Sequence, residues 1–339
     1  MKIMIFGAAG FVASHLVDKC LKEGDEVVGT IRWNEDLSRL HPDIETEYVE
    51  ATDLSSVIRA INKHRPDVLS VLYAQSWVPY SFDNPIYTMN VNAIGTLNVL
   101  EAVRIINEVD IQTTYDIGYS PDKYNPLIHI CSSSEFYGKV DKDNQPITEQ
   151  HPASPMNPYG VGKVAGDLMA QLYEKYYDQR ILITRMFTHT GLRRTMMSAE
   201  CFYAKRIAEL EKLQKKNGSY PCDPYTIKLG NMKSIRTWRD VRDAVTDYHK
   251  LFNKGKTGIY NISGDTVKSI QEVLDYLLSI SDLDKSKIKM EVDPSLLRKV
   301  DVDCQYANTD KFKDQIDQTN DYTFEQCMQD LLDYWRQNV

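Results

Sequence analysis

The chain has 339 residues, 42% of them hydrophobic and 26% charged, and a formal net charge of -8. This apolar content excludes a disordered chain and allows one large α/β domain or two fused lobes, while the acidic balance argues against binding to nucleic acid. No stretch is apolar enough to span a bilayer, and the six cysteines are scattered without a C-x-x-C pair, so we expect a cytoplasmic protein with free thiols and no membrane partner.

Short β-branched runs alternate with helical patterns over the first half of the chain, which predicts βαβ units and a parallel sheet. The expected strands are Lys2–Gly7, Glu26–Arg32, Glu45–Val49, Val68–Ala74, Leu127–Ser132 and Ile181–Phe187. The expected helices are Phe11–Glu23, Leu54–His64, Pro85–Ile106 and Pro158–Tyr177. The polar segment Asn107–Asn125, which contains Gly118 and Pro121, is expected to be a loop.

The strict alternation ends after Phe187. The charged stretch Lys212–Tyr225 is predicted to be an exposed loop because glycine and proline interrupt it. The later elements are Ile227–Gly230, a helix near Asp240–Phe252, Gly258–Ile262, a helix from Ile270 and a last helix ending near Trp335. We therefore expect a Rossmann-like, doubly wound parallel sheet in residues 1–187 and a smaller C-terminal α/β lobe in residues 188–339, with an interleaved boundary.

The turn after the first expected strand reads Gly7-Ala-Ala-Gly10-Phe11-Val12-Ala13. Small residues let the backbone approach a pyrophosphate, which then lies on the free N–H groups at the N-terminus of the following helix. A glycine motif alone is weak evidence, but its position between a strand and a helix is typical of dinucleotide binding. The alternative is a tight strand-to-helix turn that binds nothing.

Arg32 stands at the end of the second expected strand. An acidic residue there binds the ribose 2′-hydroxyl of NAD, whereas an arginine accommodates the 2′-phosphate of NADP. Arg32 thus favours NADP. Glu35 and Asp36 lie close enough to leave NAD open, and Arg32 could also be an ordinary solvated charge.

Tyr159 and Lys163 lie four residues apart near the start of an expected helix, which places both side chains on one face. A phenol is a weak base at neutral pH, and a neighbouring ammonium favours its phenolate form. Tyr159 could then accept a hydroxyl proton while a nicotinamide accepts hydride. Such a pair is common by chance, so its weight depends on the nucleotide turn upstream.

Ser133 and Glu135 come directly after the expected strand Leu127–Ser132, at the carboxyl edge of the sheet, where open α/β folds bind ligands. Ser133 could orient a reacting hydroxyl. Glu135 follows an apolar strand and precedes two aromatic residues, so it could be a tuned base. A partly buried, hydrogen-bonded structural carboxylate is the equally weighted alternative.

Together these motifs resemble the extended short-chain dehydrogenase/reductase superfamily over nearly the whole chain. The matching segments are the nucleotide turn at Gly7–Ala13, an adenine-contacting pair at Asp53-Leu54, a helix motif at Asn92–Thr96 and the triad Ser133, Tyr159 and Lys163.

Within that superfamily the chain most resembles GDP-mannose 4,6-dehydratases and related GDP-sugar dehydratases, including those acting on GDP-heptose. The segments that carry this likeness are Ala74–Pro85, Ser132–Lys139, His189 with Arg193-Arg194, Arg236–Asp243, Arg298 with Asp301, and Asn308–Lys311. The chain departs from the family pattern at Trp33, Trp77, Thr188 and Lys299. These changes leave the sugar, and NADP against NAD, unassigned.

The resemblance implies a role for each matching residue. Cofactor contacts are implied at Gly7, Gly10, Phe11, Val12, Ala13, Arg32, Asp53, Leu54, Tyr73, Ala74, Gln75, Tyr159 and Lys163. Substrate contacts are implied at Ser76, Ser81, Thr188, Arg193, Arg236, Arg298 and Asp301, although each arginine could instead be a structural ion-pair partner. Catalysis is implied at Ser133, Glu135, Tyr159 and Lys163.

The implied reaction is an internal redox cycle on a GDP-sugar. Tyr159 takes the C4 hydroxyl proton as hydride leaves C4, Glu135 removes the acidified C5 proton as water leaves C6, and the hydride returns to C6. A 4-epimerase, a 4-keto reductase or a decarboxylase of the same superfamily is the nearer alternative, and a non-catalytic nucleotide-binding protein is the remote one. Relatives commonly pair through the helices corresponding to Pro85–Ile106 and Pro158–Tyr177, so a homodimer or homotetramer is implied.

Overall fold

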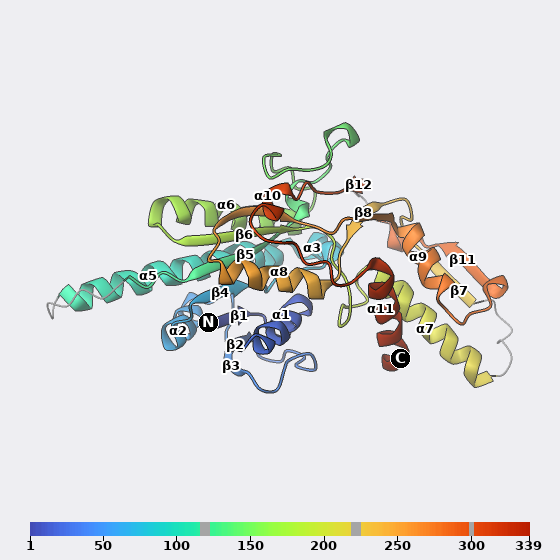
Figure 1. The fold of residues 1–339 in the computed structure, drawn as a ribbon, viewed down its shortest axis with the longest axis horizontal. Helices are drawn as coiled ribbons and strands as arrows, with labels where there is room; N and C mark the ends of the chain where they lie inside the picture. The colour runs from blue at the N-terminus through green and yellow to red at the C-terminus, as the bar shows by residue number, and fades with distance from the viewer. Residues whose placement is uncertain (116–122, 218–224, 298–301) are drawn as a thin grey trace.

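The computed structural model describes residues 1–115, 123–217, 225–297 and 302–339 (Figure 1). In this part of the chain, seven strands form one sheet in the order β3-β2-β1-β4-β5-β6-β9. Every pairing in the sheet is parallel. The strands are β1 (Lys2–Phe6), β2 (Glu26–Ile31), β3 (Glu45–Tyr48), β4 (Val68–Val71), β5 (Leu127–Ser133), β6 (Arg180–Met186) and β9 (Gly258–Ile262). The expected doubly wound parallel sheet is confirmed.

Helices cover both faces of this sheet, because alternate side chains of each strand point to opposite faces. In β1, Ile3 and Ile5 join one buried core, and Met4 and Phe6 join the other. The first core includes α1 (Phe11–Lys22) and α8 (Val241–Asn253). The second includes α2 (Leu54–His64), α5 (Gly95–Tyr115) and α6 (Pro158–Tyr177).

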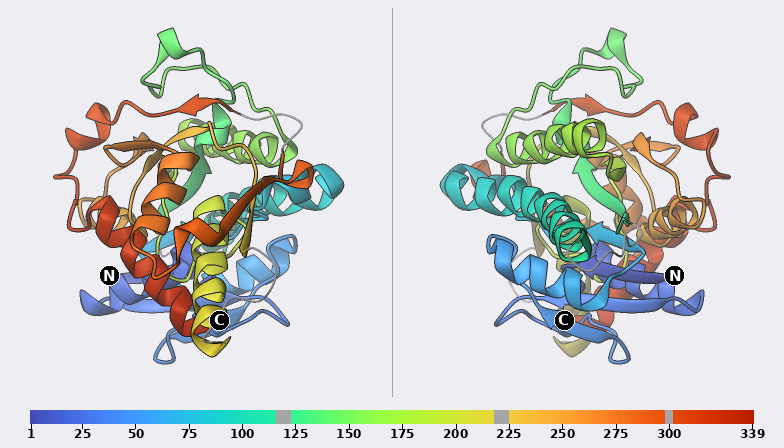
Figure 2. Two further views of the ribbon diagram at one scale, coloured as in Figure 1. Left: turned by 90° about the vertical axis from the view of Figure 1, so that its right-hand side faces the viewer. Right: turned by 90° about the vertical axis from the view of Figure 1, so that its left-hand side faces the viewer.

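A second lobe lies at the opposite end of the molecule from the outer ends of α5 and α6 (Figures 1 and 2). Its core packs side chains of three helices, including Ile207, Leu274 and Leu331. The helices are α7 (Ala199–Asn217), α9 (Ile270–Ser279) and α11 (Phe324–Asn338). Two small sheets complete the lobe: β10 (Thr266–Ser269), β8 (Ile235–Trp238) and β12 (Cys304–Gln305) in one, and β11 (Ile288–Val292) with β7 (Tyr225–Leu229) in the other.

The remaining elements are short and lie mostly between the larger ones. They are α3 (Val78–Asp83), α4 (Pro85–Met89), the π-helix η1 (Asn90–Ile94), α10 (Asp310–Lys313), and the 3-10 turns η2 (Ser134–Phe136), η3 (Lys142–Asn144), η4 (Lys285–Lys287) and η5 (Pro294–Leu296). Because α4, η1 and α5 follow one another without a break, the expected helix from Pro85 contains a π-helical turn.

The predictions of loops at Asn107–Asn125 and Lys212–Tyr225 were partly wrong. Helix α5 continues through residues 107–115, where no proline or glycine interrupts it, and Arg104 links its turns through ion pairs with Glu101 and Glu108. Helix α7 continues through residues 212–217, which are also free of helix breakers. The residues that prompted both predictions, Gly118 and Pro121 and the segment 218–224, lie outside the described residues.

The C-terminal half contributes to the large sheet as well as to the second lobe. Strand β9 pairs with β6, and α8 packs against α1. Among the described residues no helix combines the length and apolarity that a membrane crossing requires. The five described cysteines, Cys20, Cys131, Cys201, Cys304 and Cys327, are free thiols, whereas Cys222 lies outside the described residues.

Candidate active site

The glycine turn between β1 and α1 has the geometry that a dinucleotide needs. Gly7 adopts a φ of +78°, and a Cβ there would lie 3.0 Å from the Cα of Tyr73. Gly10 is the N-cap of α1 and supplies no side-chain acceptor, so the first N–H groups of the helix face outward without a capping partner. Phe11, Val12 and the buried Ala13 then begin the helix. Gly7 is thus required for the close packing against Tyr73, and the uncapped N–H groups at the start of α1 are the groups that could hold a pyrophosphate.

At the end of β2, Arg32 is surrounded by both acidic and neutral groups. Its backbone N–H donates to Glu35 at 2.9 Å, and its guanidinium lies 4.0 Å from the same carboxylate. Its Nη1 also donates to the Tyr87 hydroxyl at 3.3 Å. Trp33 is 77% exposed and packs its ring against Tyr48. A guanidinium is thus available for a 2′-phosphate, although Glu35 competes for it.

The segment that follows β4 is held in an irregular conformation by side-chain hydrogen bonds. The strand ends at Val71, earlier than the expected Ala74. The backbone N–H of Gln75 donates to Asn92 Oδ1 at 2.8 Å, and Asn92 Nδ2 donates back to the Gln75 carbonyl at 3.0 Å. Tyr73 carries a buried hydroxyl without a protein partner, and burial raises its pKa well above the ordinary value. Tyr73 borders the glycine turn, since it packs against Gly7.

Asp53 is held by its own helix. It caps α2 by accepting from the Ser55 N–H at 3.0 Å and the Ser55 hydroxyl at 2.6 Å, which lowers its pKa. Leu54 is the first residue of that helix and is partly buried. Their adenine contact stays a prediction.

Ser133 and Glu135 lie at the carboxyl end of β5. Ser133 is buried, and its Oγ accepts from the Glu135 N–H at 3.2 Å, which caps the 3-10 turn η2. The Glu135 carboxylate is partly buried and accepts from Asn157 Nδ2 at 2.8 Å. A strand that continues straight into a 3-10 turn therefore puts a hydroxyl and a carboxylate at the same edge of the sheet.

Tyr159 and Lys163 lie in the first turns of α6, as their spacing predicts. Burial raises the pKa of the Tyr159 phenol, while a hydrogen bond with Ser133 and the charge of Arg194 act in the opposite direction. Burial lowers the pKa of the Lys163 ammonium, whose Nζ donates to the Cys131 carbonyl at 2.8 Å. Burial thus favours the neutral form of each group, so a bound positive charge would be needed to favour the phenolate.

Ser133, Glu135, Tyr159 and Lys163 gather where the end of β5 meets the start of α6. Ser133 and Glu135 both act on the pKa of Tyr159, and Lys163 Nζ donates to the carbonyl of Cys131, two residues before Ser133. Arg194 belongs to the same surroundings, since its charge acts on Tyr159 and its guanidinium stacks over Phe11. Sequence reasoning gave this arginine no role.

The predicted substrate residues differ in exposure and in their partners. Thr188 follows β6 and is partly buried, and Ser76 is exposed in the segment after β4. Ser81 is fully buried and donates to the Val78 carbonyl at 2.6 Å within α3. Arg193 has a φ of +63° and forms an ion pair with Asp18 at 2.7 Å.

Arg236 lies on β8 and is partly buried, with its Nη1 donating to the Ile235 carbonyl at 2.8 Å. Gln305 pairs opposite Arg236 on β12 and donates to the Ser134 carbonyl at 2.8 Å. Strand β12 therefore ties the Arg236 sheet to the strand end that carries the catalytic candidates. Arg298 and Asp301 lie outside the described residues.

Asn157 is a site residue that sequence reasoning missed. It is the N-cap of α6 and also donates to Glu135. The signal was present, because an asparagine directly before a proline at the start of a helical pattern is a typical N-cap.

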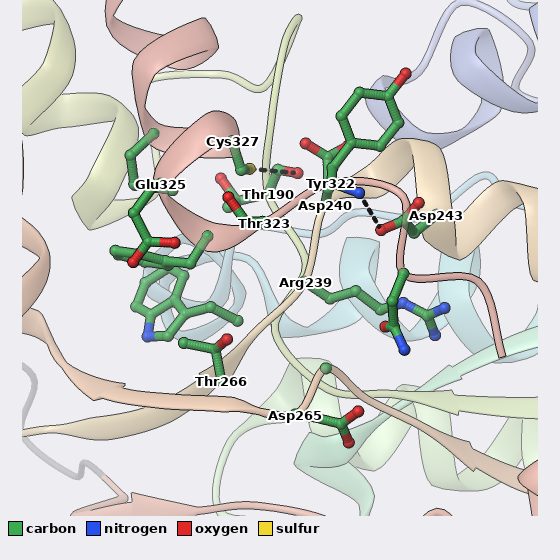
Figure 3. A pocket seen from close by; sticks show the side chains of 15 residues that line it. Thr190, Arg239, Asp240, Asp243, Asp265, Thr266, Tyr322, Thr323, Glu325 and Cys327 are labelled. Atoms are coloured by element: carbon green, nitrogen blue, oxygen red, sulfur yellow. Dashed lines mark hydrogen bonds between the residues drawn. The ribbon is translucent and has the colours of Figure 1, made fainter.

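A separate cavity of about 250 Å³ lies between β8, the start of α8 and the start of α11 (Figure 3). Asp243 lines it, and burial raises the pKa of this carboxyl, although the backbone N–H groups of Asp321 and Tyr322 donate to it. Arg239 also lines it and is bonded to Asp247. None of the four catalytic candidates borders this cavity, so it is not where the proposed chemistry occurs.

Comparisons with known proteins show which family the chain belongs to. A sequence model of the family described as GDP-mannose 4,6 dehydratase matches residues 4–331. The chain is 26% identical to GDP-mannose 4,6 dehydratase of Drosophila melanogaster over 359 residues, which cover 97% of this chain and 84% of that protein.

The chain is also 25% identical to GDP-6-deoxy-D-mannose reductase of Pseudomonas aeruginosa, over 81% of this chain and 82% of that protein. Among solved structures, the fold is similar to that of Thermus thermophilus UDP-glucose 4-epimerase in complex with NAD, with a TM-score of 0.80, 22% identity and full coverage of both chains.

Proposed function

The chain belongs to the GDP-mannose 4,6-dehydratase family, and from this membership we propose that it is a nucleotide-sugar 4,6-dehydratase acting on a GDP-hexose or GDP-heptose. The observation that carries the proposal is the Glu135 carboxylate beside the Ser133–Tyr159–Lys163 group. Oxidation and reduction alone need no such carboxylate. A base next to the redox group is what water elimination from the oxidised sugar requires.

In the proposed cycle, Ser133 orients the C4 hydroxyl and Tyr159 accepts its proton. A bound NADP or NAD supplies the hydride acceptor at C4 and the hydride donor at C6, and its positive ring in the oxidised form favours the Tyr159 phenolate. Lys163 stabilises that phenolate. Glu135 then takes the C5 proton as hydroxide leaves C6 and passes this proton to the departing hydroxide, so water is lost and a 4-keto-5,6-ene remains. When hydride adds at C6, C5 takes up a proton from solvent, which balances the proton that Tyr159 took from the C4 hydroxyl.

The proposed cofactor contacts are those of the glycine turn, Arg32, Asp53-Leu54 and the segment Tyr73–Gln75. The turn geometry supports a dinucleotide, and the guanidinium of Arg32 supports NADP. The NAD held by the Thermus epimerase keeps NAD as the alternative.

We assign dinucleotide binding to residues 1–187 and sugar-nucleotide binding mainly to residues 188–339. Arg236 is the best-supported partner for the diphosphate, because its strand is tied to the catalytic edge through Gln305. Arg193 is bonded to Asp18 and would have to exchange that ion pair for the substrate. We keep Ser76, Ser81, Thr188, Arg298 and Asp301 as predicted substrate contacts.

The exposed face of α6 supports self-association. Val161, Leu168, Leu172 and Tyr176 recur at helical spacing and are 43%, 50%, 50% and 77% exposed. An apolar stripe of this kind on a monomer is typical of an interface. We propose that a second copy of the chain covers this stripe, giving a homodimer or homotetramer.

We also propose that the enzyme is cytoplasmic, because its described cysteines are free thiols, as is usual in a reducing compartment.

Incubation of the purified protein with GDP-mannose and with GDP-heptoses, followed by mass spectrometry, tests the proposal. A dehydratase gives a product lighter by one water without added NADPH. An isomeric product would indicate a 4-epimerase, and strict NADPH consumption would indicate a reductase, the second candidate because of the Pseudomonas relative. Either result would overturn the dehydratase assignment, as would the absence of turnover with every GDP-sugar.

Glu135→Gln tests the residue that carries the proposal. The amide keeps the size of the side chain and cannot remove the C5 proton, so water loss should stop while reduced cofactor remains detectable. Unchanged product formation by this variant would remove Glu135 from the reaction.

A further inference from the structure

Asn157 connects the two halves of the catalytic group. Helix α6 begins at Pro158, and Asn157 Oδ1 accepts from the Gly160 N–H in its first turn at 2.8 Å. Its Nδ2 donates to Glu135 Oε2 at 2.8 Å at the end of β5. One amide therefore bridges the helix that carries Tyr159 and the turn that carries Glu135.

The orientation of this amide is fixed by its partners. A backbone N–H can only donate, so the atom that faces Gly160 must be the carbonyl oxygen. The NH₂ group is then left to face Glu135, whose ionised carboxylate can only accept. Asparagine satisfies both contacts, whereas aspartate and serine offer the acceptor for the helix cap but cannot supply this amide donor.

The backbone around Asn157 holds the bridge in place. Pro158 disfavours a helical conformation for the residue before it, and Asn157 is extended, with φ −151° and ψ 158°. A Cβ on Gly160 would lie 2.9 Å from the Glu135 carbonyl oxygen and 3.0 Å from the Cβ of Pro155. The first turn of α6 thus packs directly on the Glu135 backbone, which keeps the N-cap residue Asn157 next to Glu135.

We infer that Asn157 is a positioning residue for the elimination step, holding the Glu135 carboxylate in the orientation in which it removes the C5 proton. This inference rests on the proposed function. A hydrogen bond to one carboxylate oxygen leaves the other, Oε1, to receive the proton, and it fixes the side-chain rotamer relative to Tyr159. C4 oxidation needs only Ser133, Tyr159 and Lys163, so it does not depend on the bridge.

The test separates oxidation from elimination in Asn157→Asp and Asn157→Ser. Both residues are good N-caps, so α6 keeps its capping acceptor. Serine removes only the donor to Glu135, whereas aspartate also places a second negative charge beside that carboxylate, so Asn157→Ser is the decisive variant. Reduced cofactor measured in a single turnover reports C4 oxidation, and exchange of the C5 proton with heavy water reports elimination chemistry. We expect unchanged cofactor reduction and a fall in C5 exchange of about 10- to 100-fold, the range for a lost hydrogen bond to a charged group.

Ser269→Ala is the matched control, because Ser269 caps α9 in the second lobe and has no contact with the catalytic group. This variant should be less stable and should leave the ratio of the two rates unchanged. A parallel loss of oxidation and exchange in the Asn157 variants would show a structural role and overturn the inference, as would unchanged exchange.

Glu135→Gln distinguishes failure of the positioning role from failure of the proposed function. If Glu135→Gln abolishes C5 exchange and the Asn157 variants do not alter it, the positioning role is wrong and the proposed function stands. If Glu135→Gln itself exchanges normally, the proposed function fails.

Discussion

His129 should make the protein lose stability in mild acid. The imidazole lies in the middle of β5, fully buried, with Nδ1 2.9 Å from the Ser70 Oγ and Nε2 2.9 Å from the Thr184 Oγ1. Its ring packs against Tyr248 and Phe252. Burial lowers the pKa of this imidazole to about 3, and the charge of Lys163 acts in the same direction.

The sign and size of the effect follow from that shift. In the unfolded chain an imidazole binds a proton near pH 6.5, whereas in the folded protein His129 stays neutral down to about pH 3. The unfolded state therefore binds more protons below pH 6.5, and the free energy of unfolding falls as the pH drops. Between pH 6.5 and 4.5 this histidine accounts for a loss of about 2 kcal/mol.

Urea unfolding at pH 6.5 and 4.5 measures this loss in the wild type and in His129→Gln. The glutamine does not titrate, so the variant should lose about 2 kcal/mol less than the wild type over the same interval, whatever its absolute stability. His41→Gln is the control, since His41 is partly exposed in the loop after β2, and it should behave as the wild type does. Equal losses in His129→Gln and wild type would refute the reasoning.

Three further predictions concern the site, the core and the assembly. Tyr159→Phe should bind NADP or NAD but give no cofactor reduction with a GDP-sugar in a stopped-flow trace; normal reduction would exclude Tyr159 as the base. Arg185→Met should lower the free energy of unfolding by about 3–5 kcal/mol, because it leaves the fully buried Asp167, bonded to Arg185 Nε at 2.9 Å, without its counter-charge. Adding Asp167→Leu should recover much of that loss in urea titrations, and no recovery would contradict the ion-pair account. Leu172→Arg should shift the protein to monomer in sedimentation velocity, and an unchanged sedimentation coefficient would place the interface elsewhere.

Sequence patterns predicted best the elements whose ends carry strong local signals. Helix α6 begins at the proline after an N-cap asparagine and has the predicted bounds, and α2, capped by Asp53, also matches. Strand β9 matches because glycine precedes an apolar run. The end of α5 was missed because the glycine and proline that suggested a loop lie beyond the residues that remain helical. Helix α7 was not among the expected elements, and its last residues were expected to be a loop for the same reason.

The site was predictable as far as residue types and spacing decide it. Ser133, Tyr159 and Lys163 come together because β5 and α6 meet at the carboxyl edge of the sheet. Arg194, and not Arg193, acts on Tyr159. The backbone at Arg193 is left-handed, and no spacing rule predicts the direction of the two side chains that follows from it. The link between Asn157 and Glu135 joins segments 22 residues apart, so it appears only once both are folded.

We propose that Tyr159 and Glu135 act in one internal redox cycle on a GDP-sugar. Single-turnover reaction of GDP-mannose carrying deuterium at C4, with unlabelled cofactor and mass analysis of the product, tests it most directly. We predict that the deuterium is found at C6 of a 4-keto product lighter by one water. Deuterium retained at C4, or lost to the cofactor pool without water loss, would contradict the claim.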